Sequence, residues 1–154
     1  MNAASHPALP RIKDLVSHGQ VREALMLMNS LTEHRFTALY RFDRETLRNM
    51  YFFDRQNPAV ESTDAIPVLA SYCVYVRDSG RMFETTHARE DERTVGHDKR
   101  EKLQAYCGVP LVGEDGRSFG SVCHFDFDPR GISAENLQLM EAFADLIRPA
   151  PAAS

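Results

Sequence analysis

The sequence lacks the features of secreted, membrane-spanning and nucleic-acid-binding proteins. Its three cysteines have no CxxC spacing, so we expect no disulfide framework and reduced thiols in the cytoplasm. There is no run of roughly 18 apolar residues and no apolar stretch in residues 1–11, so we expect neither a membrane span nor a secretory signal. The formal net charge of −4 comes without a cluster of Lys and Arg, which argues against a nucleic-acid partner.

Common enzyme motifs are missing too. The chain contains no phosphate-binding glycine loop, no nucleophile elbow and no HExxH sequence. A zinc site could combine a cysteine with His87, His97 or His124, but no pair has HxxxH or CxxC spacing. We therefore expect no metal and no cofactor, and the sequence leans away from an enzyme without excluding one.

What is present is a composition typical of one globular domain. The chain has 154 residues, of which 43% are hydrophobic and 26% are charged, and this is enough for a single core. We expect one domain over residues 11–148, with disordered ends at 1–10 and 149–154.

The first half alternates between helical and strand periodicity. Residues 11–33 predict a helix that is interrupted near Gly19. Its apolar stripe consists of Val21, Leu25, Met28 and Leu31. Alternating apolar side chains then predict two strands, at 36–42 and 47–54, that form a hairpin.

The middle of the chain predicts a helix and then an irregular segment. Apolar residues at helical spacing favour a helix over residues 64–79, and Cys73 would lie on its buried side. This stripe consists of Ile66, Leu69, Cys73 and Val76. A short strand at 81–86 should follow, and then a polar segment at 87–101 with one helical turn after Gly96.

The clearest unit is a second hairpin, over residues 103–126, which reverses at Asp115-Gly116. Asp-Gly between two β-rich segments predicts a type I′ turn, because both central residues of that turn need positive φ. On the second strand, Phe119, Cys123 and Phe125 should share one face and His124 the other.

A final helix should follow Ser133, whose side chain can cap it. Its apolar stripe consists of Leu137, Met140, Phe143, Ala144 and Ile147. We expect Asp126, at the end of the preceding strand, to cap backbone amides rather than to catalyse a reaction. Hairpins flanked by helices at both ends predict an antiparallel sheet with helices on its faces.

The order of these segments resembles GAF domains, the small-molecule sensor modules of bacterial signalling proteins. The resemblance rests on the hairpin AYCGVPLVGEDGRSFGSVCHFDFDPRGIS and the apolar helix ENLQLMEAFADLI that follows it. Upstream, SYCVYV and FETTHAREDERTVGH are similar to the version found ahead of histidine kinases and cyclases. The similarity covers roughly residues 20–148.

The resemblance implies an α+β, GAF-like (PAS-like) fold. In it, a central antiparallel sheet of five or six strands carries the N- and C-terminal helices on one face. A ligand pocket lies on the other face, under residues 64–79 and 87–102. Such domains commonly pair through their terminal helices, so we expect a homodimer, an unidentified small-molecule ligand and a signalling partner protein. The expected ligand-binding residues are Cys73, Phe83, Asp91, Tyr106, Cys123 and Phe125.

Two alternatives remain open. Some GAF proteins reduce free methionine-R-sulfoxide through a nucleophilic cysteine, but their Gly-Cys-Gly type motif is replaced here by Ser71-Tyr72-Cys73-Val74. Buried cysteines more often act as small hydrophobic residues. The chain could also be a ligand-free scaffold for dimerisation. Asp91 with Arg93 could hold a polar ligand or form only a loop ion pair.

Overall fold

The computed structural model describes residues 6–148. The disorder expected at residues 1–5 and 149–154 therefore lies outside the described residues. Helix α1 begins at Leu9, slightly before the expected start of the domain at residue 11. Within the described residues, no helix has the length and apolar character needed to cross a bilayer.

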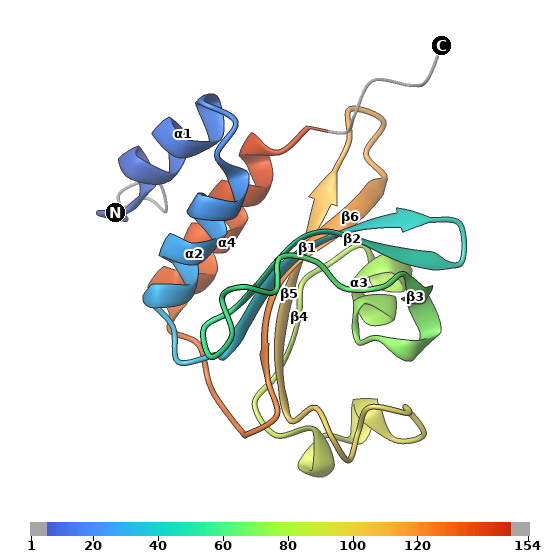
Figure 1. Cartoon of the computed structure of the whole chain (residues 1–154). Coiled ribbons are helices and arrows are strands. Elements are labelled where there is room, and N and C mark those ends of the chain that lie inside the picture. Colours follow the sequence, from blue (N-terminus) through green and yellow to red (C-terminus); the bar gives the residue numbers. More distant parts are fainter. Residues whose placement is uncertain (1–5, 149–154) are drawn as a thin grey trace.

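Six antiparallel strands form one curved sheet, in the order β3-β2-β1-β6-β5-β4 (Figure 1). This confirms the predicted α+β fold with a sheet of five or six antiparallel strands. The two predicted hairpins are its centre, because β1 pairs with β6 and so joins them. The strands are β1 (Phe36–Asp43), β2 (Thr46–Asp54), β3 (Ile66–Pro67), β4 (Phe83–Thr85), β5 (Ala105–Val112) and β6 (Ser118–Asp126).

The reversal between β5 and β6 occurs where Asp-Gly predicts it, but it is not a type I′ turn. Gly116 has positive φ (80°), whereas Asp115 does not. The loop closes through a hydrogen bond from the Gly113 amide to the Arg117 carbonyl (2.9 Å). The Asp115 carboxylate accepts a hydrogen bond from the Arg117 amide (3.0 Å), so Asp115 stabilises the loop through its side chain.

Three helices cover one face of the sheet (Figure 1): α1 (Leu9–Ser17), α2 (Val21–Ser30) and α4 (Ala134–Leu146). The predicted break near Gly19 is confirmed, since Gly19 has positive φ (75°) between α1 and α2. The Ser133 cap is also confirmed by its hydrogen bond from the Asn136 amide (3.1 Å). The apolar stripes of α2 and α4 face the sheet and form a closed core with it, which includes Leu25, Met28, Leu39, Val122, Met140 and Phe143. Leu31, predicted on the first stripe, instead follows the end of α2 and is 40% exposed.

The opposite face is covered more thinly, and here the helix predicted over residues 64–79 is wrong in its first half. Only α3 (Cys73–Ser79) is α-helical. Before it, the short strand β3 pairs with β2, and a 3₁₀ turn follows at Val68–Ala70. Pairing with the sheet edge replaced the helical hydrogen bonds, and Leu69, predicted on the buried stripe, is 65% exposed.

Residues 86–104, which join β4 to β5, complete this cover and form the cover segment. Strand β4 confirms the short strand predicted at 81–86. Two 3₁₀ turns that were not predicted, Ala88–Glu90 and Glu92–Thr94, precede Gly96. After Gly96, where one helical turn was predicted, residues 98–102 form hydrogen-bonded turns rather than a helix, and the Leu103 amide donates to the Lys99 carbonyl (2.8 Å).

Candidate functional site

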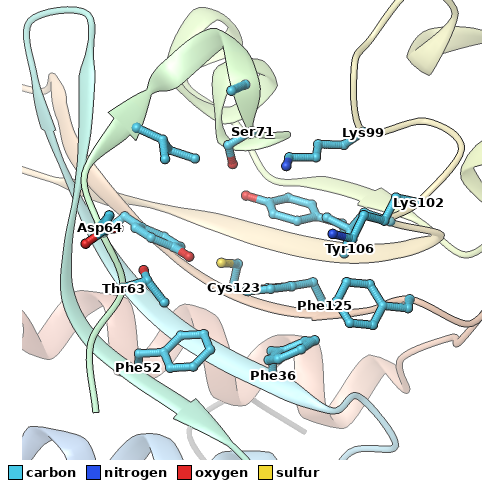
Figure 2. Close-up of a pocket in the computed structure, with 15 residues that line it drawn as sticks. Phe36, Phe52, Thr63, Asp64, Ser71, Lys99, Lys102, Tyr106, Cys123 and Phe125 are labelled. Atoms are coloured by element: carbon cyan, nitrogen blue, oxygen red, sulfur yellow. The ribbon is translucent and has the colours of Figure 1, made fainter. Parts of the chain in front are cut away.

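A cavity of about 330 Å³ lies on the sheet face opposite the terminal helices, beneath the thin cover (Figure 2). Its lining comes from β1, β2, β5 and β6 below and from residues 63–71 and 99–103 above. The lining residues are Phe36, Tyr40, Phe52, Thr63, Asp64, Ile66, Ala70, Ser71, Lys99, Lys102, Leu103, Tyr106, Cys123, Phe125 and Phe127.

Aromatic side chains form one wall of the cavity. The rings of Phe36 and Phe125 stack with centroids 4.9 Å apart, and Phe52 meets Phe36 at 5.8 Å. Phe127 packs edge-on against Phe36 at 5.2 Å. Strand alternation explains this wall: Phe36 and Phe125 are cross-strand partners in the β1–β6 register and therefore share a face.

Tyr106 lies flat along β5 because residue 108 is a glycine. A Cβ at Gly108 would overlap the ring and hydroxyl of Tyr106, so only glycine leaves room for this arrangement. The Tyr106 hydroxyl thereby reaches the Sγ of Cys73 and donates a hydrogen bond to it (3.1 Å). Burial, with the neighbouring Cys73 thiol, raises the pKa of Tyr106 well above its usual value.

Cys73 and Cys123 form a buried thiol pair at the inner end of the site. Burial alone would raise the pKa of Cys73. Hydrogen bonds from Cys123, Ser121 and Tyr106 outweigh it and lower that pKa to about 7. Burial and the hydrogen bond to Cys73 raise the pKa of Cys123 well above its usual value. The Cys73 Sγ thus accepts hydrogen bonds from the Tyr106 hydroxyl (3.1 Å) and the Ser121 hydroxyl (3.2 Å).

Asp91 and Arg93 brace the cover segment. The Asp91 carboxylate accepts hydrogen bonds from the Arg93 amide (3.0 Å) and guanidinium (2.7 Å), which holds the pKa of Asp91 at about 2. The Arg93 guanidinium lies 4.4 Å from the Phe83 ring centroid, and Phe83 packs against Tyr75 at 4.6 Å.

The structure brings together three of the six expected ligand-binding residues. Tyr106, Cys123 and Phe125 line the cavity, and Cys73 lies directly behind Tyr106. Phe83 is part of the aromatic core under the cover, and Asp91 borders a separate polar surface hollow.

The predicted face of Phe119 is wrong. It packs against the core under the terminal helices, because the strand twists and its register shifts at Leu111/Val112.

Twelve of the fifteen lining residues are not among the expected ligand-binding residues. Phe36 and Phe52 were assigned to strands but not to the site, although their alternation with Cys123 across the sheet could have shown it. Lys99 and Lys102 lie in an irregular segment, whose path no periodicity predicts. The same holds for residues 63–71, because a helix was expected there.

The remaining candidates lie elsewhere. Cys107 belongs to the core on the helix side, where burial raises its pKa to about 12. His124 also faces the helices: its Nδ1 lies 2.6 Å from the Thr37 hydroxyl, and its ring stacks on His34. Asp126 accepts hydrogen bonds from the Arg35 and Asp128 amides (2.9 and 2.8 Å), as predicted. Among the described residues, no group of three potential metal ligands comes together.

Known structures share this fold. The free methionine-R-sulfoxide reductase of Neisseria meningitidis, solved with its substrate, superposes with a TM-score of 0.72 at 15% identity, over 94% of this chain and 86% of that one. The GAF domain of an Acinetobacter phosphoenolpyruvate-protein phosphotransferase gives 0.70 at 14% identity, over 95% and 93% of the two chains. At such low identity, these likenesses show the fold alone.

Sequence comparisons identify the family to which the chain belongs. A cyclic di-GMP phosphodiesterase of Pseudomonas aeruginosa is 32% identical over 81 residues, which are 50% of this chain and only 14% of that protein. The family model of the GAF domain matches residues 17–150, nearly the whole chain. The chain therefore belongs to the GAF domain family.

Proposed function

We propose that this protein is a sensory or regulatory domain that binds a small molecule in the cavity under residues 63–71 and 99–103. The observation that carries the proposal is the cavity itself: an aromatic wall faces a few polar groups that converge from the cover. Small-molecule sites typically combine an apolar lining with a few placed polar groups. Because protein cores are normally close-packed, a space of this size is more typical of a binding site than of a core.

Ligand binding would act through the cover. Residues 63–71 and 99–103 contribute to the lining and belong to the thinly packed layer, so a bound molecule would favour one arrangement of that layer. Such a shift needs a ligand with different affinities for the two arrangements. The output would pass to a partner protein or to a second copy of the chain.

A homodimer through the terminal helices remains part of the proposal. The apolar stripes of α2 and α4 are buried within the chain, so a dimer would use other helix surfaces. Val16, Val21 and Ile147 are half-buried around a groove on that side. Size-exclusion chromatography with light scattering measures the mass directly, and a monomer at high concentration would remove this element.

We propose a cytoplasmic location, because Cys73, Cys107 and Cys123 are free thiols that a reducing compartment preserves.

The cavity can be tested by filling it. Ala70 lines the cavity and is half-buried, so Ala70→Phe should occupy part of the space. Ala59, in an exposed loop, provides the matched control Ala59→Phe. A thermal-shift and native mass spectrometry screen with metabolites of varied charge should yield ligands that bind the wild type and Ala59→Phe but not Ala70→Phe. Equal binding to all three proteins would contradict the proposal.

The cysteine arrangement gives less support to the reductase alternative. Cys107 lies on the opposite face of the sheet from Cys73 and Cys123, and Cys73 has no exposed surface. A catalytic thiolate needs access to its substrate. Single Cys→Ser variants in a thioredoxin-linked assay of free methionine sulfoxide reduction test it. Activity that one of these substitutions abolishes would favour the enzyme.

A further inference from the structure

The cover segment uses its arginines and its lysines differently. Each arginine is tied to a protein group: Arg89 pairs with Glu101 (3.1 Å), and Arg93 pairs with Asp91 (2.7 Å). Arg100 donates to the Thr94 hydroxyl (3.1 Å) and to the Arg89 carbonyl (2.8 Å). These contacts hold the segment's shape.

Lys99 and Lys102 are not used in this way. Within residues 6–148 neither ammonium forms an ion pair, although each lysine directly follows an acidic residue, Asp98 or Glu101. Both side chains line the cavity and enter it from the same side (Figure 2). Lys99 is half-buried, whereas Lys102 is exposed, with its Nζ 5.5 Å from the centroid of the Phe127 ring. Two ammonium groups that line an apolar cavity attract an anion, and the half-buried Lys99 should contribute more because a partly desolvated charge interacts more strongly.

The other walls restrict what that anion can be. The stacked rings of Phe36 and Phe125 offer a flat apolar surface on which a further ring can pack. Thr63 and Asp64 lie across the cavity from the lysines (Figure 2), and the Asp64 carboxylate disfavours a second negative charge at that end. A volume of about 330 Å³ is near the lower end of the range for ligand sites, roughly 300–1,000 Å³, which suits one ring.

Resting on the proposed function, we propose that the ligand is a monocarboxylate with a single aromatic ring. Its carboxylate lies between Lys99 and Lys102, and its ring packs on the wall formed by Phe36 and Phe125. The far end of the ring approaches Thr63 and Asp64. A hydroxyl there donates to the Asp64 carboxylate, whereas a second carboxylate meets repulsion.

The test uses calorimetric titration with four probes. These are 3-(4-hydroxyphenyl)propionate, its neutral amide, the ringless anion propionate, and the dianion 4-carboxyphenylpropionate. We expect the first probe to bind about tenfold more tightly than the amide, which lacks the charge that the lysines attract, and than the dianion, which meets repulsion from Asp64; tenfold corresponds to about 1.4 kcal/mol. Propionate should not bind measurably. An amide or dianion that binds as tightly as the first probe overturns the inference.

Variants assign the contact to the lysines. Lys99→Met and Lys102→Met should each weaken the first probe by about five- to twentyfold and leave the amide unchanged. Lys13→Met, on the exposed surface of α1, is the matched control and should change neither. Unchanged carboxylate binding in both cavity variants overturns the inference.

Failure of the inference is separable from failure of the proposed function. Neutral or cationic compounds that bind the wild type and are excluded by Ala70→Phe, while no aryl carboxylate binds, would overturn the ligand class alone. Absence of any compound that distinguishes the wild type from Ala70→Phe would overturn both.

Discussion

The two faces of the central sheet are built from alternating residues of the same strands, yet they are covered in different ways. On one face, α1, α2 and α4 bury aliphatic side chains such as Leu25 and Met140 in a closed core. On the other face, aromatic side chains such as Phe36 and Tyr106 meet only α3 and irregular segments, and a cavity remains (Figure 1).

This difference separates stability from binding. Three regular helices offer continuous apolar stripes, which can fill the space against a sheet. Short segments held by ion pairs and turns cannot fill it, and large rings at the sheet surface then line a hollow. Because the cover is local in sequence, it can change its arrangement without unfolding the helix side.

Deleting a ring from each face should give the largest contrast in stability. Phe143→Ala, on the helix side, removes a fully buried ring and should lower the free energy of unfolding by about 3–5 kcal/mol. Phe125→Ala, on the cavity side, should cost less, about 1–2 kcal/mol, since the ring is half-buried and already borders empty space. Urea unfolding measures both values.

The Phe125 variant should also lose ligand affinity, which Phe143→Ala should retain at temperatures where it is folded. Equal destabilisation by the two substitutions would remove the distinction between a closed and a hollow face.

The helix side could be predicted from the sequence in most of its detail. The stripes of α2 and α4 and the existence of the two hairpins follow from periodicity, because these segments are regular; the register shift that turns Phe119 toward the helices does not. Strand β3 could not be predicted in this way, because Ile66 and Leu69 have helical spacing and indicate a helix. In the structure this segment pairs with the edge of β2, so its backbone hydrogen bonds go to the sheet and not to a helix.

Acid should weaken the helix side through its buried histidines. Burial lowers the pKa of His34 to about 4 and that of His124 to about 3, from the usual 6.5. Both groups are neutral in the folded protein and become protonated in the unfolded chain below its pKa of 6.5. Stability is therefore complete above that pH and falls as the pH drops toward 4.

The expected loss between pH 7 and pH 5 is about 2 kcal/mol for each histidine, or about 4 kcal/mol for the two together, measured by urea unfolding at each pH. His34→Gln should reduce this pH dependence, whereas His18→Gln, at the exposed end of α1, should not. An identical pH dependence in His34→Gln and the wild type would show that other groups govern acid stability.

The site was harder to predict than the fold, for a physical reason. Tyr106, Cys123 and Phe125 lie on regular strands, so alternation assigns them to the cavity face. Lys99 and Lys102 reach the same space from a segment shaped by ion pairs and 3₁₀ turns. Such side-chain contacts depend on the whole tertiary arrangement, which local sequence patterns do not specify.

Gly108→Ala should disturb the cavity side alone. The new Cβ would displace Tyr106 from its place along β5 and break its hydrogen bond to Cys73. We expect a loss of about 1–3 kcal/mol in unfolding free energy, together with weaker ligand binding. Gly131→Ala is the matched control, because its Cβ would meet only Thr86 Cγ2 at 3.7 Å. Unchanged ligand binding in Gly108→Ala would mean that the position of Tyr106 does not matter to the site.

The smallest effect should come from the brace of the cover. Asp91→Ala removes a cap and an ion pair from a partly buried carboxylate and should cost about 1 kcal/mol. Asp14→Ala breaks an exposed i,i+3 pair with Arg11 on α1 and should cost close to nothing. Hydrogen exchange should accelerate in residues 88–103 of Asp91→Ala and remain unchanged on the helix side.

Ligand affinity in Asp91→Ala then distinguishes the two roles first considered for this residue. As a brace, Asp91 acts only through the position of Lys99 and Lys102, so the loss of affinity should be similar for every ligand that reaches them. As a direct contact, it would change the preference between anionic and cationic ligands. A change in charge preference would place Asp91 in the site, and the cover would then have to close further over the cavity than the structure shows.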